Sequence, residues 1–162
     1  MPPIHDAAKA IDRDELKRLV QSREADINEK NADGFTALHI AAQEGHFPML
    51  QWMVEEGGAD VAARNHDGYT ALKYAVRWGY TNIASWLLHK GGADITDIDN
   101  NGQTVWDKFK WRCEIAPDTP QPKVDFYSVL RCFGSPAPTS DAFIASIGET
   151  GNFTPAHRDL LL

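Results

Sequence analysis

The sequence predicts an all-α solenoid, a stack of antiparallel helix pairs joined by β-turn loops. Three observations carry this prediction. Asp33-Gly34-Phe35-Thr36-Ala37-Leu38 returns 34 residues later as Asp67-Gly68-Tyr69-Thr70-Ala71-Leu72, and again as Asn101-Gly102-Gln103-Thr104-Val105-Trp106. Gly58-Ala59-Asp60-Val61 returns at the same step as Gly92-Ala93-Asp94-Ile95. Each period has room for two short helices with an apolar face. Self-similarity at a fixed period of this length is the signature of a repeat architecture.

Each repeat begins with a turn and a short first helix. Gly34 accepts a positive φ angle, which a tight turn after Asp33 requires. Thr36 stands where an N-cap residue belongs, and this predicts a helix over residues 37–44. Gly45 follows at the place where glycine ends a helix. The same residue types recur one period later at Gly68, Thr70, residues 71–78 and Gly79.

A second helix completes each repeat. Residues 48–56 begin with Pro48, which is tolerated in the first turn of a helix because its missing N–H is not needed there. Their apolar side chains follow the spacing i, i+1, i+4, i+5 and form one stripe. The stripe is Met49, Leu50, Met53 and Val54, and its counterpart in the next predicted helix, residues 82–89, is Ile83, Ala84, Leu87 and Leu88.

This combination of a turn, two helices, T-x-L-H-x-A-A, Gly-His and Gly-Ala-Asp resembles the ankyrin repeat. The resemblance covers about three and a half repeats over residues 4–112. The first copy lacks its opening turn. The second spans residues 33–66 and the third 67–100, while the fourth keeps only the turn and the first helix, residues 101–112.

The sequence departs from the family pattern at one position of interest. The histidine of that pattern is present as His39, but Lys73 and Asp107 occupy its place in the next two copies. In the family this histidine bonds the backbone of a neighbouring turn. The resemblance therefore implies a weaker network between repeats toward the C-terminus.

The composition changes after Arg112, where six of the nine prolines lie between Pro117 and Pro155. We therefore expect a repeat domain over residues 1–116 and a proline-containing helical extension over residues 117–162. Residues 124–133 are predicted to form a helix that packs antiparallel on the first helix of the fourth repeat and caps the stack. The apolar end, Leu160-Leu161-Leu162, is expected to reflect truncation of a longer protein or packing on the repeats.

Composition excludes several classes of function. The net charge of −7 disfavours non-specific binding to nucleic acid, which needs basic side chains. No apolar run reaches the roughly 18 residues of a membrane span, and the N-terminus lacks a signal peptide, so we expect a cytoplasmic or nuclear monomer. The six histidines show no metal-ligand spacing, and no nucleophile or phosphate-loop motif is present. We therefore expect no metal, no cofactor and no enzymatic activity.

The resemblance implies a non-catalytic module that binds a partner protein through its concave surface. The expected contacts come from the turns and the ends of the first helices, where Trp78 and Trp111 are either partner contacts or core residues covered by the extension. The full set is Ala32, Asp33, Phe35, Gln43, Glu44, His66, Asp67, Tyr69, Arg77, Trp78, Asn100, Asn101, Gln103, Trp111 and Arg112.

Two alternatives remain open from the sequence. Lys123-Val124-Asp125-Phe126 resembles the short docking motif K/R-V-x-F that type-one protein phosphatases recognise, which would make the chain a regulatory targeting subunit. The chain is otherwise an ankyrin fragment of a larger multidomain enzyme or channel.

Overall fold

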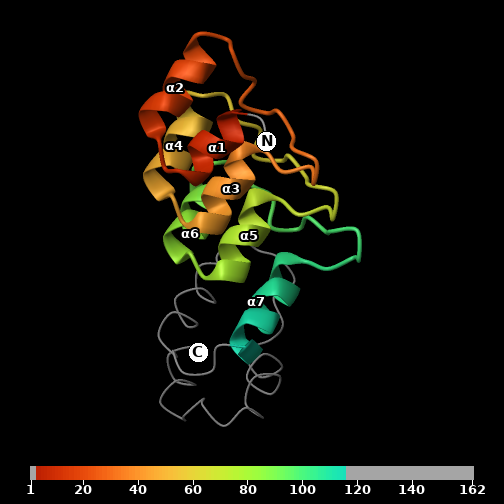
Figure 1. Ribbon diagram of the computed structural model, residues 1–162. Helices are drawn as coiled ribbons and strands as arrows, with labels where there is room; N and C mark the ends of the chain where they lie inside the picture. The colour runs from red at the N-terminus through yellow and green to blue at the C-terminus, as the bar shows by residue number, and fades with distance from the viewer. Residues whose placement is uncertain (1–2, 116–162) are drawn as a thin grey trace.

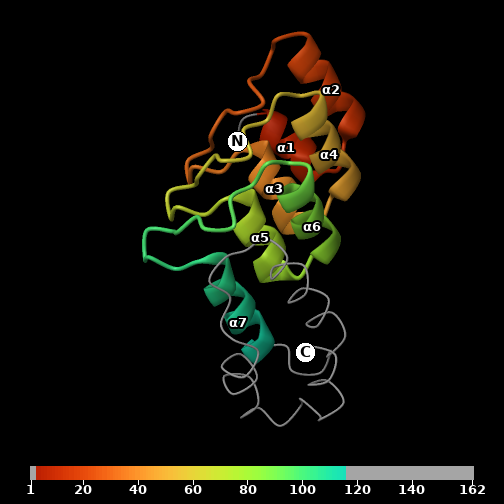
Figure 2. The same cartoon turned by 180° about the vertical axis from the view of Figure 1, so that it is seen from behind.

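The computed structural model describes residues 3–115, and over this range it contains seven α-helices and no strand. The helices are α1 (Pro3–Lys9), α2 (Arg13–Gln21), α3 (Ala37–Glu44), α4 (Phe47–Glu55), α5 (Ala71–Trp78), α6 (Thr81–His89) and α7 (Val105–Ile115). Helices α1, α3, α5 and α7 follow one another in an inner row, with α2, α4 and α6 in an outer row (Figures 1 and 2). Three loops, residues 22–36, 56–70 and 90–104, project as fingers from the other side of the inner row. The predicted all-α solenoid is confirmed over the described residues.

The predicted helix boundaries are nearly right. Thr36 is the extended N-cap of α3, with φ −93° and ψ 168°, and Gly45 ends α3 in the left-handed conformation with φ 81°. The outer helices α4 and α6 each begin one residue earlier than predicted. Helix α7 continues to Ile115, three residues beyond its predicted end, because Cys113 stands in the register of the glycines that end α3 and α5.

The first repeat has a residue other than glycine at the position where Gly45 and Gly79 end α3 and α5. Ile11 lies one period before Gly45 and also adopts a left-handed backbone, with φ 61°. Its side chain is 59% exposed. A left-handed backbone is unfavourable for a β-branched residue, because Cβ crowds the following carbonyl oxygen. The turn between α1 and α2 is therefore strained where the later turns are not.

The core lies between the two rows of helices. Ala7, Ala41 and Ala75 stand one period apart on the inner helices and are all buried, so α1, α3 and α5 can pack closely. The apolar stripes predicted for the second helices supply the other side, and Leu50 and Leu87 are fully buried there. Burial of one such side chain contributes roughly 1.5–3 kcal/mol to stability.

The fingers are joined to one another by backbone hydrogen bonds. The N–H of His66 donates to the carbonyl oxygen of Asp33 at 3.2 Å, and the N–H of Asn100 donates to that of Asp67 at 3.1 Å. Gly34 has φ 80°, and a Cβ atom there would lie 2.8 Å from the backbone nitrogen of His66. Glycine thus permits both the turn and the close approach of the next finger.

Several predictions lie outside the described residues. These are the extension over residues 117–162 with its boundary at 116, the capping helix over residues 124–133, and the Lys123–Phe126 motif. Within the described residues, Val105, Trp106 and Phe109 of α7 are buried, and α7 packs on α5.

Candidate functional site

One buried side chain from each of the inner helices α1, α3 and α5 bonds to the next repeat. Nε2 of His39 lies 2.8 Å from the carbonyl oxygen of Tyr69, which belongs to the following finger. The flanking junctions repeat this contact one period away: Nε2 of His5 lies 2.7 Å from the carbonyl oxygen of Phe35, and Nζ of Lys73 donates to that of Gln103 at 2.8 Å. The network expected to weaken at Lys73 keeps this bond, because an ammonium group can also donate to a backbone carbonyl.

His39 performs a second task within its own repeat. Its Nδ1 accepts the backbone N–H of Thr36 at 3.1 Å, which satisfies a free donor at the start of α3. Nε2 must then carry the hydrogen that is donated to Tyr69. Burial lowers the pKa of His39, so the neutral ring that both bonds require is the favoured form.

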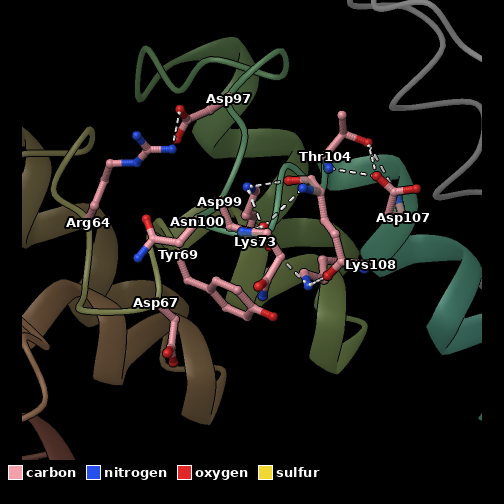
Figure 3. Close-up of polar contacts among 12 residues, drawn as sticks. Arg64, Asp67, Tyr69, Lys73, Asp97, Asp99, Asn100, Thr104, Asp107 and Lys108 are labelled. Atoms are coloured by element: carbon pink, nitrogen blue, oxygen red, sulfur yellow. Dashed lines mark hydrogen bonds and ion pairs between the residues drawn. The ribbon is translucent and has the colours of Figure 1, made fainter.

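The two tasks of this histidine are divided between different residues further along. Lys73 bonds the next repeat but has no acceptor for the start of α5. Asp107, one period later, performs only the task at the start of its own helix. Its Oδ2 accepts the backbone N–H of Thr104 at 2.7 Å and the Thr104 hydroxyl at 2.8 Å (Figure 3). A carboxylate has no hydrogen to donate to a further turn.

The charge of Lys73 is balanced inside the protein. Figure 3 shows Lys73, Asp99 and Lys108 directed toward one another, and all three side chains are buried. Oδ2 of Asp99 lies 3.1 Å from Nζ of Lys108 and 4.0 Å from Nζ of Lys73. It accepts no hydrogen bond of good geometry, so its contact with the lysines is chiefly charge attraction. Two ammonium groups on one carboxylate leave this cluster with one net positive charge.

The pKa shifts in this cluster have clear causes. Burial lowers the pKa of Lys73, and the nearby Asp99 charge opposes that shift. Burial alone would raise the pKa of Asp99, but hydrogen bonds from the backbone N–H groups of Gln103 and Asn101, together with the positive charge of Lys108, outweigh it and hold that pKa below its usual value. Asp99 is therefore ionised and supplies the counter-charge for both lysines.

An aromatic cluster lies beside these junctions. The ring centroid of Tyr74 is 5.2 Å from that of Phe35 and 5.5 Å from that of Tyr69. Nζ of Lys108 lies 4.4 Å from the centroid of Tyr69. Burial raises the pKa of Tyr74 to about 12, so its hydroxyl stays protonated and accepts a hydrogen bond from Asn65 Nδ2 at 3.1 Å. The fingers are thus held against the inner helices by aromatic contacts as well as by hydrogen bonds.

Two hollows open between the fingers and the inner helices. The N-terminal hollow has a volume of about 250 Å³, and its lining includes Lys9, Asp33, Phe35, Ile40, Gln43 and Glu44. The C-terminal hollow has a volume of about 210 Å³ and is lined by Tyr69, Arg77, Gln103, Asp107, Lys108 and Trp111.

Comparison with known families decides what this architecture is. A family model described as ankyrin repeats, in three copies, matches residues 4–99, which is more than half of the chain. The chain belongs to the ankyrin repeat family. No curated protein matches the chain. Ankyrin repeats are generally protein–protein interaction modules, and the family is typically non-catalytic.

The sequence-predicted contact residues all lie in the fingers or on the inner helices of these ankyrin repeats. Eight of them line the two hollows: Asp33, Phe35, Gln43 and Glu44 in the first, and Tyr69, Arg77, Gln103 and Trp111 in the second. Ala32, His66, Asp67, Asn100 and Asn101 are exposed residues of the fingers, and Arg112 is half-buried near the end of α7. Trp78 and Trp111 are 46% and 38% exposed, so they are not core residues. Tyr69 is only 9% exposed and presents little area to a partner.

Some residues of the ankyrin hollows were not predicted. Lys9 stands one period before Gln43, so the repeat spacing could have identified it. Ile40 and Lys108 share another register, two periods apart, one in each hollow. Nothing in the local sequence shows that these positions face the concave side.

Two other kinds of feature are absent from residues 3–115. The described part of the chain has no group of three or more His, Cys, Asp or Glu side chains placed to hold a metal ion. Among its helices, none has the length and apolar character needed to cross a membrane.

Proposed function

We propose that this chain is a non-catalytic interaction module that binds a partner protein through the concave surface formed by its fingers and inner helices. One observation carries the proposal: the two hollows lie between the fingers and the inner helices, and the exposed ring of Trp111 lines the C-terminal one. Aromatic residues provide much contact area at little cost in side-chain entropy, which is why they dominate binding hot spots.

The rigidity of this surface supports the proposal. Its fingers are fixed to one another by backbone hydrogen bonds and to the inner helices by the bonds of His5, His39 and Lys73. Trp111 is held in place by the guanidinium group of Arg77, which lies 4.9 Å from its ring centroid. A surface ordered before binding loses little entropy on association. By the same proposal, the module acts as a monomer in the cytoplasm or nucleus.

Site-specific photo-crosslinking tests the proposal. A photoreactive amino acid replaces Trp78 on the concave side or, as a matched control, Glu55, an exposed residue near the end of the outer helix α4. We expect a discrete crosslinked partner from position 78 and none from position 55. Trp111→Ala should then weaken capture of that same partner. A partner that crosslinks equally from position 55, or that ignores Trp111→Ala, would contradict the concave-surface proposal.

A further inference from the structure

The charge of the concave surface changes sign from one end to the other. The positions compared are one finger-tip position and two positions at the end of the inner helix, each repeated at 34 residues. The second repeat has Asp33, Gln43 and Glu44 there, the third Asp67, Arg77 and Trp78, and the fourth Asn101, Trp111 and Arg112. The net charge at these positions is −2 in the second repeat, 0 in the third and +1 in the fourth. The hollows follow this order, because Lys9, Asp33 and Glu44 in the N-terminal one sum to −1, while Arg77, Lys108 and Asp107 in the C-terminal one sum to +1.

Arg77 is the cation of the C-terminal hollow that has no counter-charge. No ion pair between residues 3 and 112 includes Arg77, and its Nε atom is buried without a hydrogen-bond partner. Its guanidinium group is nevertheless held in position, 4.9 Å from the ring centroid of Trp111 and 6.0 Å from that of Trp78. Nε is the only nitrogen of this group that is buried without a partner, so a carboxylate would be bound by the edge that the two Nη groups form.

Lys108 adds to the positive field of this hollow. Its ammonium group contacts Asp99, but Asp99 also faces Lys73, so one carboxylate serves two lysines. The uncompensated positive charge lies in a buried setting where water screens it weakly. An anionic group from a partner is therefore attracted here more strongly than the acidic protein as a whole suggests.

We propose that the C-terminal hollow binds an Asp or Glu side chain of the partner, with Arg77 as its main hydrogen-bond donor, while the N-terminal hollow receives a Lys or Arg side chain beside Asp33 and Glu44. This proposal rests on the proposed function and adds the chemistry and the orientation of the partner. The partner segment lies with its acidic end toward α7 and its basic end toward α1.

The geometry also sets the spacing of the two partner residues. The N-terminal hollow lies beside α1 and α3 and the C-terminal hollow beside α5 and α7, so they are two inner-helix steps apart. Packed helices are separated by 8–10 Å, which gives roughly 16–20 Å between the hollows. An extended chain rises about 3.3 Å per residue. The acidic and basic residues of an extended partner segment are therefore about five or six positions apart.

Peptide selection tests this inference and does not require the natural partner to be identified. A displayed library of random 12-residue peptides is selected on the full chain, and peptides that the Trp78→Ala variant no longer binds are kept as concave-surface binders. We expect these peptides to be enriched in Asp or Glu about five or six positions from Lys or Arg. Their affinities are then measured for Arg77→Gln and for a matched control, Arg23→Gln, which removes an exposed arginine that follows outer helix α2.

Arg77→Gln should weaken binding roughly ten- to a hundredfold, the usual effect of losing a hydrogen bond to a charged group. Arg23→Gln should leave the affinity unchanged. Arg77→Lys keeps the charge and should retain part of the affinity, which separates loss of the charge from disturbed folding in Arg77→Gln. Concave-surface binders without acidic enrichment, or insensitive to Arg77→Gln, overturn the charge inference and leave the proposed function standing. If selection yields no binder that depends on Trp78, both proposals fail.

Discussion

The middle and the C-terminal junctions of the stack make the same bond with different chemistry. At the middle junction, neutral His39 both completes the start of α3 and bonds the following finger. At the C-terminal junction, Lys73 makes only the bond to the finger, and its charge requires Asp99 as a buried partner. The contact thus recurs at the same position of each repeat, but a neutral side chain makes it at one junction and a charged side chain at the other. The two junctions should respond differently to mutation and to pH.

The largest expected effect comes from removing the counter-charge at the C-terminal junction. Asp99→Ala leaves Lys73 and Lys108 buried without an anion, and we expect a loss of roughly 3–5 kcal/mol in the free energy of unfolding. Urea unfolding measures it. Asp97→Asn is the control, because Asp97 pairs with the exposed Arg64 and should matter by less than about 1 kcal/mol. Equal effects of the two substitutions would show that the cluster is not electrostatically important.

The corresponding change at the middle junction should cost somewhat less. His39→Ala removes two buried hydrogen bonds without leaving a charge behind, so we expect a loss of roughly 2–4 kcal/mol. Asp107→Ala removes only the helix-start half of this task and should cost about 1 kcal/mol. Asp107→Asn keeps an acceptor and serves as the control. Urea unfolding of these variants would argue against the divided roles if Asp107→Ala cost as much as His39→Ala.

The fingers should not distinguish the two junctions. Gly34 and Gly68 both have φ 80°, and at each a Cβ atom would lie 2.8 Å from the backbone nitrogen of the next finger. Gly68→Val should therefore cost roughly 1–3 kcal/mol, as should Gly34→Val. Gly92→Ala is the control for backbone strain alone, because φ is 75° and the space around it is open. Thermal melting measures both effects. If the melting temperatures of Gly34→Val and Gly68→Val differed, the fingers themselves would account for part of the difference between the two junctions.

Acid should weaken the histidine junction selectively. The folded state lowers the pKa of His39, so the unfolded chain binds its proton more tightly. The stability that neutral His39 provides is present above its unfolded pKa of about 6.5 and is lost as pH falls through the lower folded value. The loss approaches about 1.4 kcal/mol per pH unit for one such proton. Urea titrations from pH 8 to pH 4 should show this slope reduced in His39→Gln, and an unchanged slope would contradict the assignment.

The smallest expected effect is a gain. Ile11 holds the left-handed position that glycine holds in the next two repeats, so Ile11→Gly should raise the free energy of unfolding by about 1 kcal/mol. Ile11→Val is the control, because it keeps a β-branched side chain and the strain. A melting temperature lowered by Ile11→Gly would mean that this exposed side chain makes a contact worth more than the backbone strain.

Sequence alone predicted most of the backbone of the described region. Spacing located helices α3 to α7 to within a few residues, because Thr36, Gly45 and their copies act locally. The chemistry of the C-terminal junction could not be predicted in this way. Lysine is rarely fully buried, and the partners of Lys73, which are Asp99 and Gln103, lie 26 and 30 residues further along the chain. The sequence therefore suggested a gap in the network where the structure has a charged cluster.

The concave surface shows the same division. The period identified eight of the residues that line the hollows, but not how deeply each is buried. Tyr69 was expected to contact a partner, and it is buried because Lys108 and Tyr74 lie against its ring. The charge of Arg77 could be read from the sequence, whereas its lack of a counter-charge is a property of the assembled stack. Predictions about the extension, including its capping helix and the Lys123–Phe126 motif, lie beyond the described residues and stay predictions.

The hydrogen bonds between repeats have a consequence for how the protein is made. The bonds of His5, His39 and Lys73 to the next finger each span 30 residues, and the Asn100 side chain bonds the His66 carbonyl across 34. Each contact can therefore form as soon as one further repeat has left the ribosome, without waiting for a distant part of the chain. Synthesis at 5–20 residues per second then separates successive junctions by roughly 2–7 seconds. During translation the histidine junctions close first, and the lysine junction closes last, once Gln103 has emerged.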